Sequence, residues 1–141
     1  MLERTLLLIK PDGVVRGLVD EIMARVAGAD LKVIASKTIQ LTNGLAGDLY
    51  SVHLDKPFYP GLLKFITSGQ VVANIIESED AIARTRAIMG ATDPREAEAG
   101  TIRGDLKEEN IFTPEKTMKN LVHGSDSAQS ARREIKILFG G

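Results

Sequence analysis

Residues 120–126, which read Asn-Leu-Val-His-Gly-Ser-Asp, hold the side chains of this chain that are best suited to chemistry. His123 is one of only two histidines, and a neutral imidazole is both nucleophilic and half-titrated near neutral pH. The Ser125–Asp126 pair after it is typical of a helix start, where free backbone N–H groups attract anions. From these residues alone, His123 is either a nucleophile for an anionic substrate or a structural histidine.

The composition excludes several other functions. The chain has 141 residues and no cysteine, so disulfides, thiolate chemistry and cysteine-based zinc sites drop out. Its 18 basic and 19 acidic residues give a net charge of −1, which argues against a protein that coats nucleic acid or an anionic membrane. The apolar run at residues 6–9 is too short for a signal peptide or a membrane span. We therefore expect one cytoplasmic domain over residues 1–141.

Hydrophobic periodicity predicts the elements that position His123. An apolar strand at residues 5–9 ends in a turn, Lys10-Pro11-Asp12-Gly13. The chain then continues with a helix at 18–28, a strand at 32–40, a helical hairpin at 42–69, a strand at 71–77 and a helix at 79–89.

The last third of the chain is less regular. Residues 91–119 show no sustained period and are predicted to be a long loop, a feature that usually has a functional reason. Residues 125–133 predict a short helix and residues 134–139 a final strand, although the helix can also continue through Leu138. The resulting βαββαβ order predicts an α+β, ferredoxin-like sandwich: a four-stranded antiparallel sheet with helices on one face.

Three stretches together resemble nucleoside diphosphate kinase: Lys10-Pro11-Asp12-Gly13, the Gly-Thr-Ile-Arg-Gly-Asp run at 100–105, and residues 120–126. Residues 56–62, 67–69 and 89–94 also look like that family, so the similarity runs from residue 3 to residue 139. The resemblance implies transfer of the terminal phosphoryl group from a nucleoside triphosphate, typically ATP, to a nucleoside diphosphate. It implies a ping-pong route through phosphohistidine on His123, with low base specificity.

The resemblance also assigns the residues that would hold the phosphates. Lys10 would contact the transferring phosphate and the sugar hydroxyl, which Asn120 would hold from the other side. Arg86, Thr92 and Arg103 would bind phosphate oxygens, a role that suits the planar guanidinium. The residues themselves also allow a solvated strand end, an exposed helix face and a charged turn.

Further positions would serve the base and the nucleophile. Phe58 would stack on the base with Leu62 beside it, unless both only pack the helical hairpin. Tyr50 would lie beside the imidazole, and Glu134 with Ser125 would orient the ring, as a catalytic histidine needs a third group. Ser125 is otherwise a helix cap. His53, which matches no family motif, is expected on the surface.

The resemblance implies Mg²⁺ carried by the nucleotide phosphates, with no fixed protein ligand. It also implies a homo-oligomer built from dimers, either a tetramer or a hexamer, and no membrane or specific nucleic-acid partner. Residues 106–119 contain a segment longer than the family usually has, and the usual apolar base contact falls near Thr117. We expect activity to survive this insertion, while the assembly differs.

Two other functions stay open from the residues. A non-catalytic ferredoxin-like module could bind nucleotides as a regulatory signal. A nucleic-acid binder could stack bases on exposed aromatic side chains, but two Tyr, four Phe and no net basic charge offer little for that role.

Overall fold

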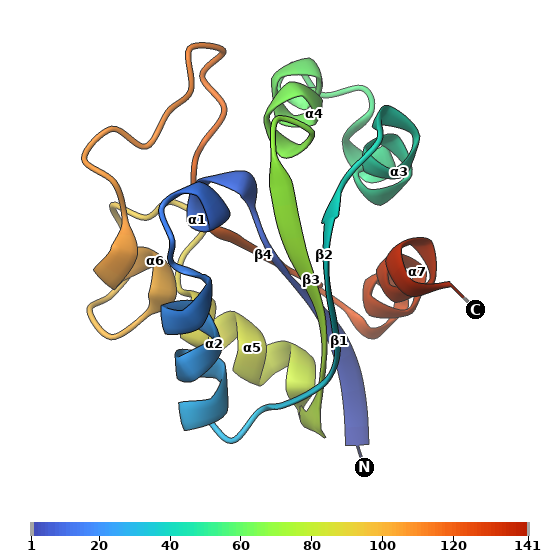
Figure 1. The fold of residues 1–141 in the computed structure, drawn as a ribbon, viewed down its shortest axis with the longest axis vertical. Coiled ribbons are helices and arrows are strands. Elements are labelled where there is room, and N and C mark those ends of the chain that lie inside the picture. Colours follow the sequence, from blue (N-terminus) through green and yellow to red (C-terminus); the bar gives the residue numbers. More distant parts are fainter. Residues whose placement is uncertain (1, 141) are drawn as a thin grey trace.

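The structure, a computed structural model, describes residues 2–140 and is built around one four-stranded sheet (Figure 1). Its strands are β1 (Leu2–Ile9), β2 (Lys32–Gln40), β3 (Gln70–Glu79) and β4 (Val122–Gly124). They lie in the order β2-β3-β1-β4, and every neighbouring pair is antiparallel. This is the predicted α+β, ferredoxin-like sheet.

The helices follow the predicted order with two additions. They are α1 (Pro11–Val15), α2 (Val19–Gly28), α3 (Asn43–Leu49), a 3₁₀ turn (Ser51–His53), α4 (Tyr59–Ile66), α5 (Ala81–Met89), α6 (Ile102–Leu106) and α7 (Ala128–Phe139). The additions are α1, where the sequence predicts only a turn, and α6, inside the predicted long loop. Both are single turns of five residues, too short to give a periodic signal. Among residues 2–140, no helix is long and apolar enough to cross a membrane.

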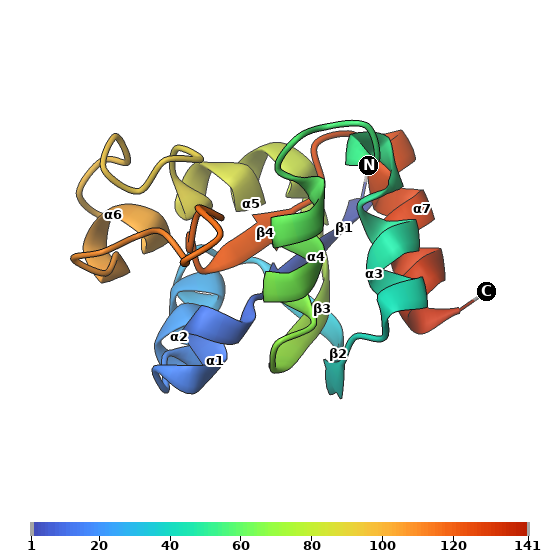
Figure 2. The same ribbon diagram turned by 90° about the horizontal axis from the view of Figure 1, so that it is seen from above.

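Helices cover both faces of the sheet, so the prediction of helices on one face is wrong. Along β1, Leu6 and Leu8 join a core cluster with α3, α4 and α7, while Leu7 and Ile9 join a second cluster with α2 and α5. Figure 2 shows α2 on one side of the sheet and α3 with α7 on the other. A strand buried on both faces is apolar at every position, which is why residues 6–9 form an unbroken apolar run.

The end of the chain corrects a second prediction. Residues 134–139 belong to α7 and are not a strand, while the fourth strand is β4, which carries His123. A helix forms here instead of a strand because Ala131 and Leu138 share one buried helical face. The side chain of Ser127 also caps the N-terminus of α7 by accepting a hydrogen bond from the Ser130 N–H. Ser125 therefore does not cap this helix.

Candidate functional site

A cavity of about 530 Å³ opens where α3, α4, α5 and α7 surround the end of β4. Its size is that of a small-molecule site. Five cationic side chains but only two carboxylates line it: Lys10, Arg86, Arg103, Lys116 and Arg133 against Asp126 and Glu134. The cavity is therefore suited to an anion although the chain has a net charge of −1.

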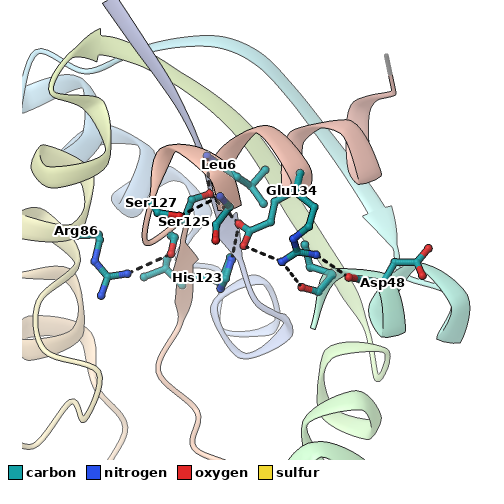
Figure 3. A network of polar contacts seen from close by, with 12 residues as sticks. Leu6, Asp48, Arg86, His123, Ser125, Ser127 and Glu134 are labelled. Atoms are coloured by element: carbon teal, nitrogen blue, oxygen red, sulfur yellow. Dashed lines mark hydrogen bonds and ion pairs between the residues drawn. The ribbon is translucent and has the colours of Figure 1, made fainter. Parts of the chain in front are cut away.

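His123 lies at the centre of a polar network between β4 and α7 (Figure 3). Its Nε2 is 2.9 Å from Glu134 Oε1, and the same oxygen accepts a hydrogen bond of 2.7 Å from the Ser125 hydroxyl. Burial raises the pKa of Glu134, but hydrogen bonds from His123 and Ser125 outweigh it and hold that pKa below its usual value. An ionised carboxylate only accepts, so Nε2 carries the proton and the neutral ring keeps its lone pair on Nδ1.

Two neighbours further restrict the imidazole. The Tyr50 ring meets it edge-on with centroids 5.6 Å apart, and burial, with Glu134 nearby, raises the pKa of Tyr50, so the phenol is neutral. Ser125, only 1% exposed, also accepts a hydrogen bond from the Leu6 N–H of β1. Glu134 and Tyr50 fix the ring on one side. The other side is accessible, because 21% of the His123 side chain is exposed.

Lys10 and Asn120 form a buried pair at the end of β1. The Lys10 Nζ donates to Asn120 Oδ1 at 2.7 Å, and Asn120 Nδ2 donates to the Thr92 carbonyl at 2.9 Å. Burial and the charge of Arg103 lower the pKa of Lys10 to about 8, against a smaller opposite effect of Asp12. Lys10 is therefore a buried ammonium that is charged at neutral pH but loses its proton more easily than an exposed lysine.

Arg103 fastens the segment before His123. Its Nε donates to the Asn120 carbonyl, its Nη2 to the Val122 carbonyl and its Nη1 to the Gly90 carbonyl, at 2.7–3.1 Å. Burial and Arg86 lower the pKa of Arg103 to about 10, so it is still charged at pH 7. Three of its five N–H groups serve the backbone, and the remaining two are left for a ligand.

Arg86 extends from α5 toward the same cavity (Figure 3). It is exposed, and its Nη1 donates only a long hydrogen bond of 3.4 Å to the Gly124 carbonyl. Arg84, two residues earlier, instead donates to the Ala29 and Glu79 carbonyls. Of these two arginines, Arg86 is the one that lines the cavity.

The other end of the cavity is apolar. Phe58, at the start of α4, is 50% exposed, and its ring lies 5.3 Å from that of His53. Leu62 lines the cavity one helical turn later and is 8% exposed. His53 is only partly exposed and lines the cavity too, a role that the sequence gives no motif to indicate.

Part of the inserted segment closes this apolar end. A bridge between Phe112 and Met118 and a hydrogen bond of 2.9 Å from the Thr113 N–H to the Thr117 carbonyl make it a hairpin-like turn. Glu115 on the turn pairs with Lys64 of α4 at 3.1 Å. Four residues of the inserted segment are among those that line the cavity: Phe112, Lys116, Thr117 and Met118. The insertion thus lies beside the site.

The structure brings the predicted residues together from across the chain. Ten of them line the one cavity: Lys10, Tyr50, Phe58, Leu62, Arg86, Thr92, Arg103, Asn120, His123 and Glu134. Ser125 lies behind Glu134. Sequence reasoning missed Arg133, whose guanidinium donates to the Asp48 and Leu49 carbonyls of α3, and the buried Asp12. Only Asp12 had a signal, because it belongs to the Lys-Pro-Asp-Gly motif.

Comparison with known proteins identifies the family. The model of the nucleoside diphosphate kinase family matches residues 3–141. The nucleoside diphosphate kinase of Acidiphilium cryptum is 49% identical over 139 residues, covering 99% of this chain and 94% of that protein. That of Nocardia farcinica is 51% identical over 140 residues, covering 99% and 96%.

Solved structures agree with this assignment. The halophilic nucleoside diphosphate kinase from Halobacterium salinarum, determined in complex with CDP, is similar with a TM-score of 0.91 and 41% identity, covering 100% of this chain and 90% of that one. The fold and the site are therefore those of a phosphotransferase for nucleotides. The chain belongs to the nucleoside diphosphate kinase family, as its motifs predict, and is an enzyme of nucleoside diphosphate phosphotransfer.

Proposed function

We propose that the enzyme works by a ping-pong route in which His123 carries the phosphoryl group between the donor triphosphate and the acceptor diphosphate. The observation that carries this proposal is the Nε2–Glu134 hydrogen bond, which directs the free lone pair of the ring to Nδ1. Nδ1 attacks the terminal phosphorus, the bond to the bridging oxygen breaks, and the nucleoside diphosphate leaves. A second diphosphate then takes the phosphoryl group from Nδ1 by the reverse step.

Positioning and charge neutralisation account for most of the rate in phosphoryl transfer. Lys10, Arg86 and Arg103 supply positive charge around the cavity from three separate elements. Asn120, which accepts a hydrogen bond from Lys10, would share the sugar hydroxyl with it. As positive charge develops on the phosphorylated ring, the ionised Glu134 stabilises it.

Magnesium fits this site as part of the substrate. Among residues 2–140, no group of three or more His, Asp or Glu side chains converges as a metal site. Two carboxylates line the cavity, Glu134 and Asp126, and Glu134 is hydrogen-bonded to His123 and Ser125. One remaining carboxylate does not make a protein cage for a metal ion. Mg²⁺ bound to the nucleotide phosphates supplies further charge neutralisation, as it does in nucleotide sites that lack a protein cage.

Low base specificity follows from the apolar end. Phe58 and Leu62 offer a ring face and a methyl surface, and every base has a π-face that can stack. Neither side chain can hydrogen-bond to a base edge. We therefore propose that purine and pyrimidine diphosphates are all accepted, with binding determined mainly by the phosphates and the sugar.

Initial-rate kinetics test the mechanism. With ATP varied at several fixed concentrations of dTDP, GDP or CDP, the double-reciprocal lines are expected to be parallel, because the two substrates occupy the site in turn. The kcat/KM values are expected to lie within about tenfold of each other, the range that one apolar contact can discriminate. Intersecting lines would contradict the phosphohistidine route, and an enzyme that accepts a single base would contradict loose specificity.

We also propose a homo-oligomer built from dimers. Within residues 2–140 the edge strand β2 pairs with β3 alone, and a free edge is a surface for strand pairing. Val15 is 82% exposed and Leu2 63%, so both offer apolar side chains to a partner subunit. Light scattering of the purified protein decides this, and a monomer at micromolar concentration would contradict it.

A further inference from the structure

Asp12 is a buried carboxylate with no direct part in the proposed transfer from ATP to His123. It lies on α1, two residues after Lys10, and is 7% exposed. Its Oδ2 accepts a hydrogen bond of 3.0 Å from the Leu121 N–H, and its Oδ1 is buried with no hydrogen-bond partner within residues 2–140. A buried carboxylate needs hydrogen bonds or nearby cations to compensate for lost water, and Asp12 has one hydrogen bond. The charges around it must supply the rest.

The residue that Asp12 holds has an unusual backbone. Leu121 has a φ of +71°, in the left-handed region that side chains other than glycine rarely adopt, and it is 1% exposed. The Lys10 N–H donates to the Leu121 carbonyl at 2.8 Å, so residues 10–12 bind both the N–H and the carbonyl of Leu121. From another direction, Arg103 binds the carbonyls of Asn120 and Val122. This turn sends the Asn120 side chain to Lys10 and continues two residues later into His123.

The charge of Asp12 acts on the same group of residues. It raises the pKa of Lys10 and of Arg103, against burial and the neighbouring cations, which lower both. Burial raises the pKa of Asp12 itself, while Lys10 and the hydrogen bond from the Leu121 N–H act to lower it. Glu108, which is paired with Lys119, is a further negative charge that acts on Asp12. Asp12 is thus the negative charge that favours the protonated state of both buried cations.

We propose that Asp12 is a positioning residue for the reaction. Through the Leu121 N–H it holds residues 120–123 in the turn that places Asn120 against Lys10, and its negative charge stabilises the buried Lys10 ammonium beside it. It touches no reacting atom. This inference rests on the proposed function, because it assigns Asp12 a role in phosphorylating His123.

Two substitutions separate its hydrogen bond from its charge. Asp12→Asn keeps an acceptor for the Leu121 N–H and removes the charge, whereas Asp12→Ala removes both. Asp20→Asn is the matched control, since Asp20 is exposed in the first turn of α2. For each protein, the rate at which labelled ATP phosphorylates His123 is measured from pH 6 to pH 10, per folded chain.

The expected loss at pH 7 is on the order of tenfold for Asp12→Asn and a hundredfold for Asp12→Ala, because small displacements at a reacting centre have effects of this size. The alkaline fall in rate, which follows the loss of the Lys10 proton, should move down by about one pH unit in Asp12→Asn. Asp20→Asn should match the wild type in both respects.

A purely structural Asp12 would lower the folded fraction but leave the alkaline midpoint of the remaining activity unchanged, and that result would overturn the inference. So would an Asp12→Asn enzyme with the rate and pH profile of the wild type. If Asp12→Ala does not fold, Asp12→Asn decides alone. A wild type that takes no label contradicts the proposed function, and this inference with it, whereas a labelled wild type with an unaffected Asp12→Asn contradicts the inference alone.

Discussion

The two ends of the cavity are built on opposite principles. At the end where we propose that the phosphates bind, the phosphate end, Lys10, Arg103, Asn120 and Glu134 are all at most 7% exposed, and each forms hydrogen bonds to side chains or carbonyls that fix its position. At the apolar end, where we propose that the base binds and which we call the base end, Phe58 is half exposed, and Val52 is more exposed still.

The difference corresponds to what each end must do. Phosphoryl transfer requires reacting atoms in line within a fraction of an ångström, so these four groups are buried and interlocked, while Arg86 and Thr92 beside them are exposed. This arrangement destabilises the fold in two ways. Two cations, Lys10 and Arg103, share a desolvated region. In addition, Leu121 adopts a left-handed backbone conformation at a cost of about 1 to 2 kcal/mol. Stacking on any base requires only an accessible ring, which does not disturb the core.

Loss of the nucleophile should have the largest effect. His123→Gln removes the imidazole that is proposed to carry the phosphoryl group, so kcat should fall by on the order of 10⁴-fold or more. The nucleotide Kd should change little, because the cations and Phe58 remain. Stopped-flow or coupled assays give kcat, and calorimetry with ADP gives Kd. Turnover near that of the wild type would refute the assignment.

Lys10 should link activity and stability in opposite directions. Its pKa in the folded state is about 8 against an ordinary 10.5, so the ammonium is lost and kcat/KM should fall as pH rises through about 8. Between these values the unfolded chain binds more protons than the folded chain, so the free energy of unfolding should rise with pH by up to about 3 kcal/mol.

Lys10→Met tests both halves of this prediction. The substitution should lower kcat/KM by about a hundredfold, and the free energy of unfolding should no longer rise with pH between about 8 and 10.5, because the group that titrates there is gone. Lys136→Met, at an exposed position of α7, is the control and should affect neither quantity. A strongly destabilised but active Lys10→Met would show that Lys10 is structural.

The base end should respond in binding and not in turnover. Phe58→Ala should raise KM about tenfold for every nucleotide, since stacking on one aromatic ring contributes about 1 to 3 kcal/mol, and kcat should stay within about twofold. Phe65→Ala on the same helix is the matched control, because Phe65 does not line the cavity. A fall in kcat with unchanged KM would erase the contrast between the two ends.

The inserted turn should have the smallest effect. Phe112→Ala removes one wall of the base end and the contact of that ring with Arg95, whose guanidinium carbon lies 5.3 Å from the ring centre. We expect KM to rise only about two- to threefold, as an exposed cation–π contact contributes roughly 0.5 to 1 kcal/mol. Measuring KM for CDP and GDP tests this, and a rise of KM above tenfold would place the inserted turn among the main binding elements.

Much of the site is predictable from local motifs. The Lys10–Gly13 stretch, the run at 100–105 and residues 120–126 indicate Lys10, Arg103, Asn120 and His123, and the structure brings all four to one cavity. The sheet is predictable as well, because β1, β2 and β3 have clear apolar patterns. The sequence spacing of His123 and Glu134 does not show that the chain turns back through α7 and brings the two side chains into contact.

The errors have physical causes. Residues 134–139 satisfy both a period of 2 and a helical period, and the choice depends on the tertiary contacts of α7 with α3 and β1, which bury Leu138. The single turns α1 and α6 are too short to show a period, and the three-residue β4 is defined only by its pairing with β1. The contact of the inserted turn with α4 depends on the Lys64–Glu115 pair, 51 residues apart, which no local pattern indicates.

The most direct test of the account is to locate the phosphoryl group. Purified enzyme is mixed with γ-labelled ATP without an acceptor, denatured in alkali and digested, and the labelled peptide is sequenced by mass spectrometry. If His123 carries the phosphoryl group, about one label per active site is expected, on His123 Nδ1, stable in alkali, lost in acid and discharged by any added nucleoside diphosphate. Label on another residue, or transfer to the acceptor with no labelled enzyme at any time, would contradict this assignment.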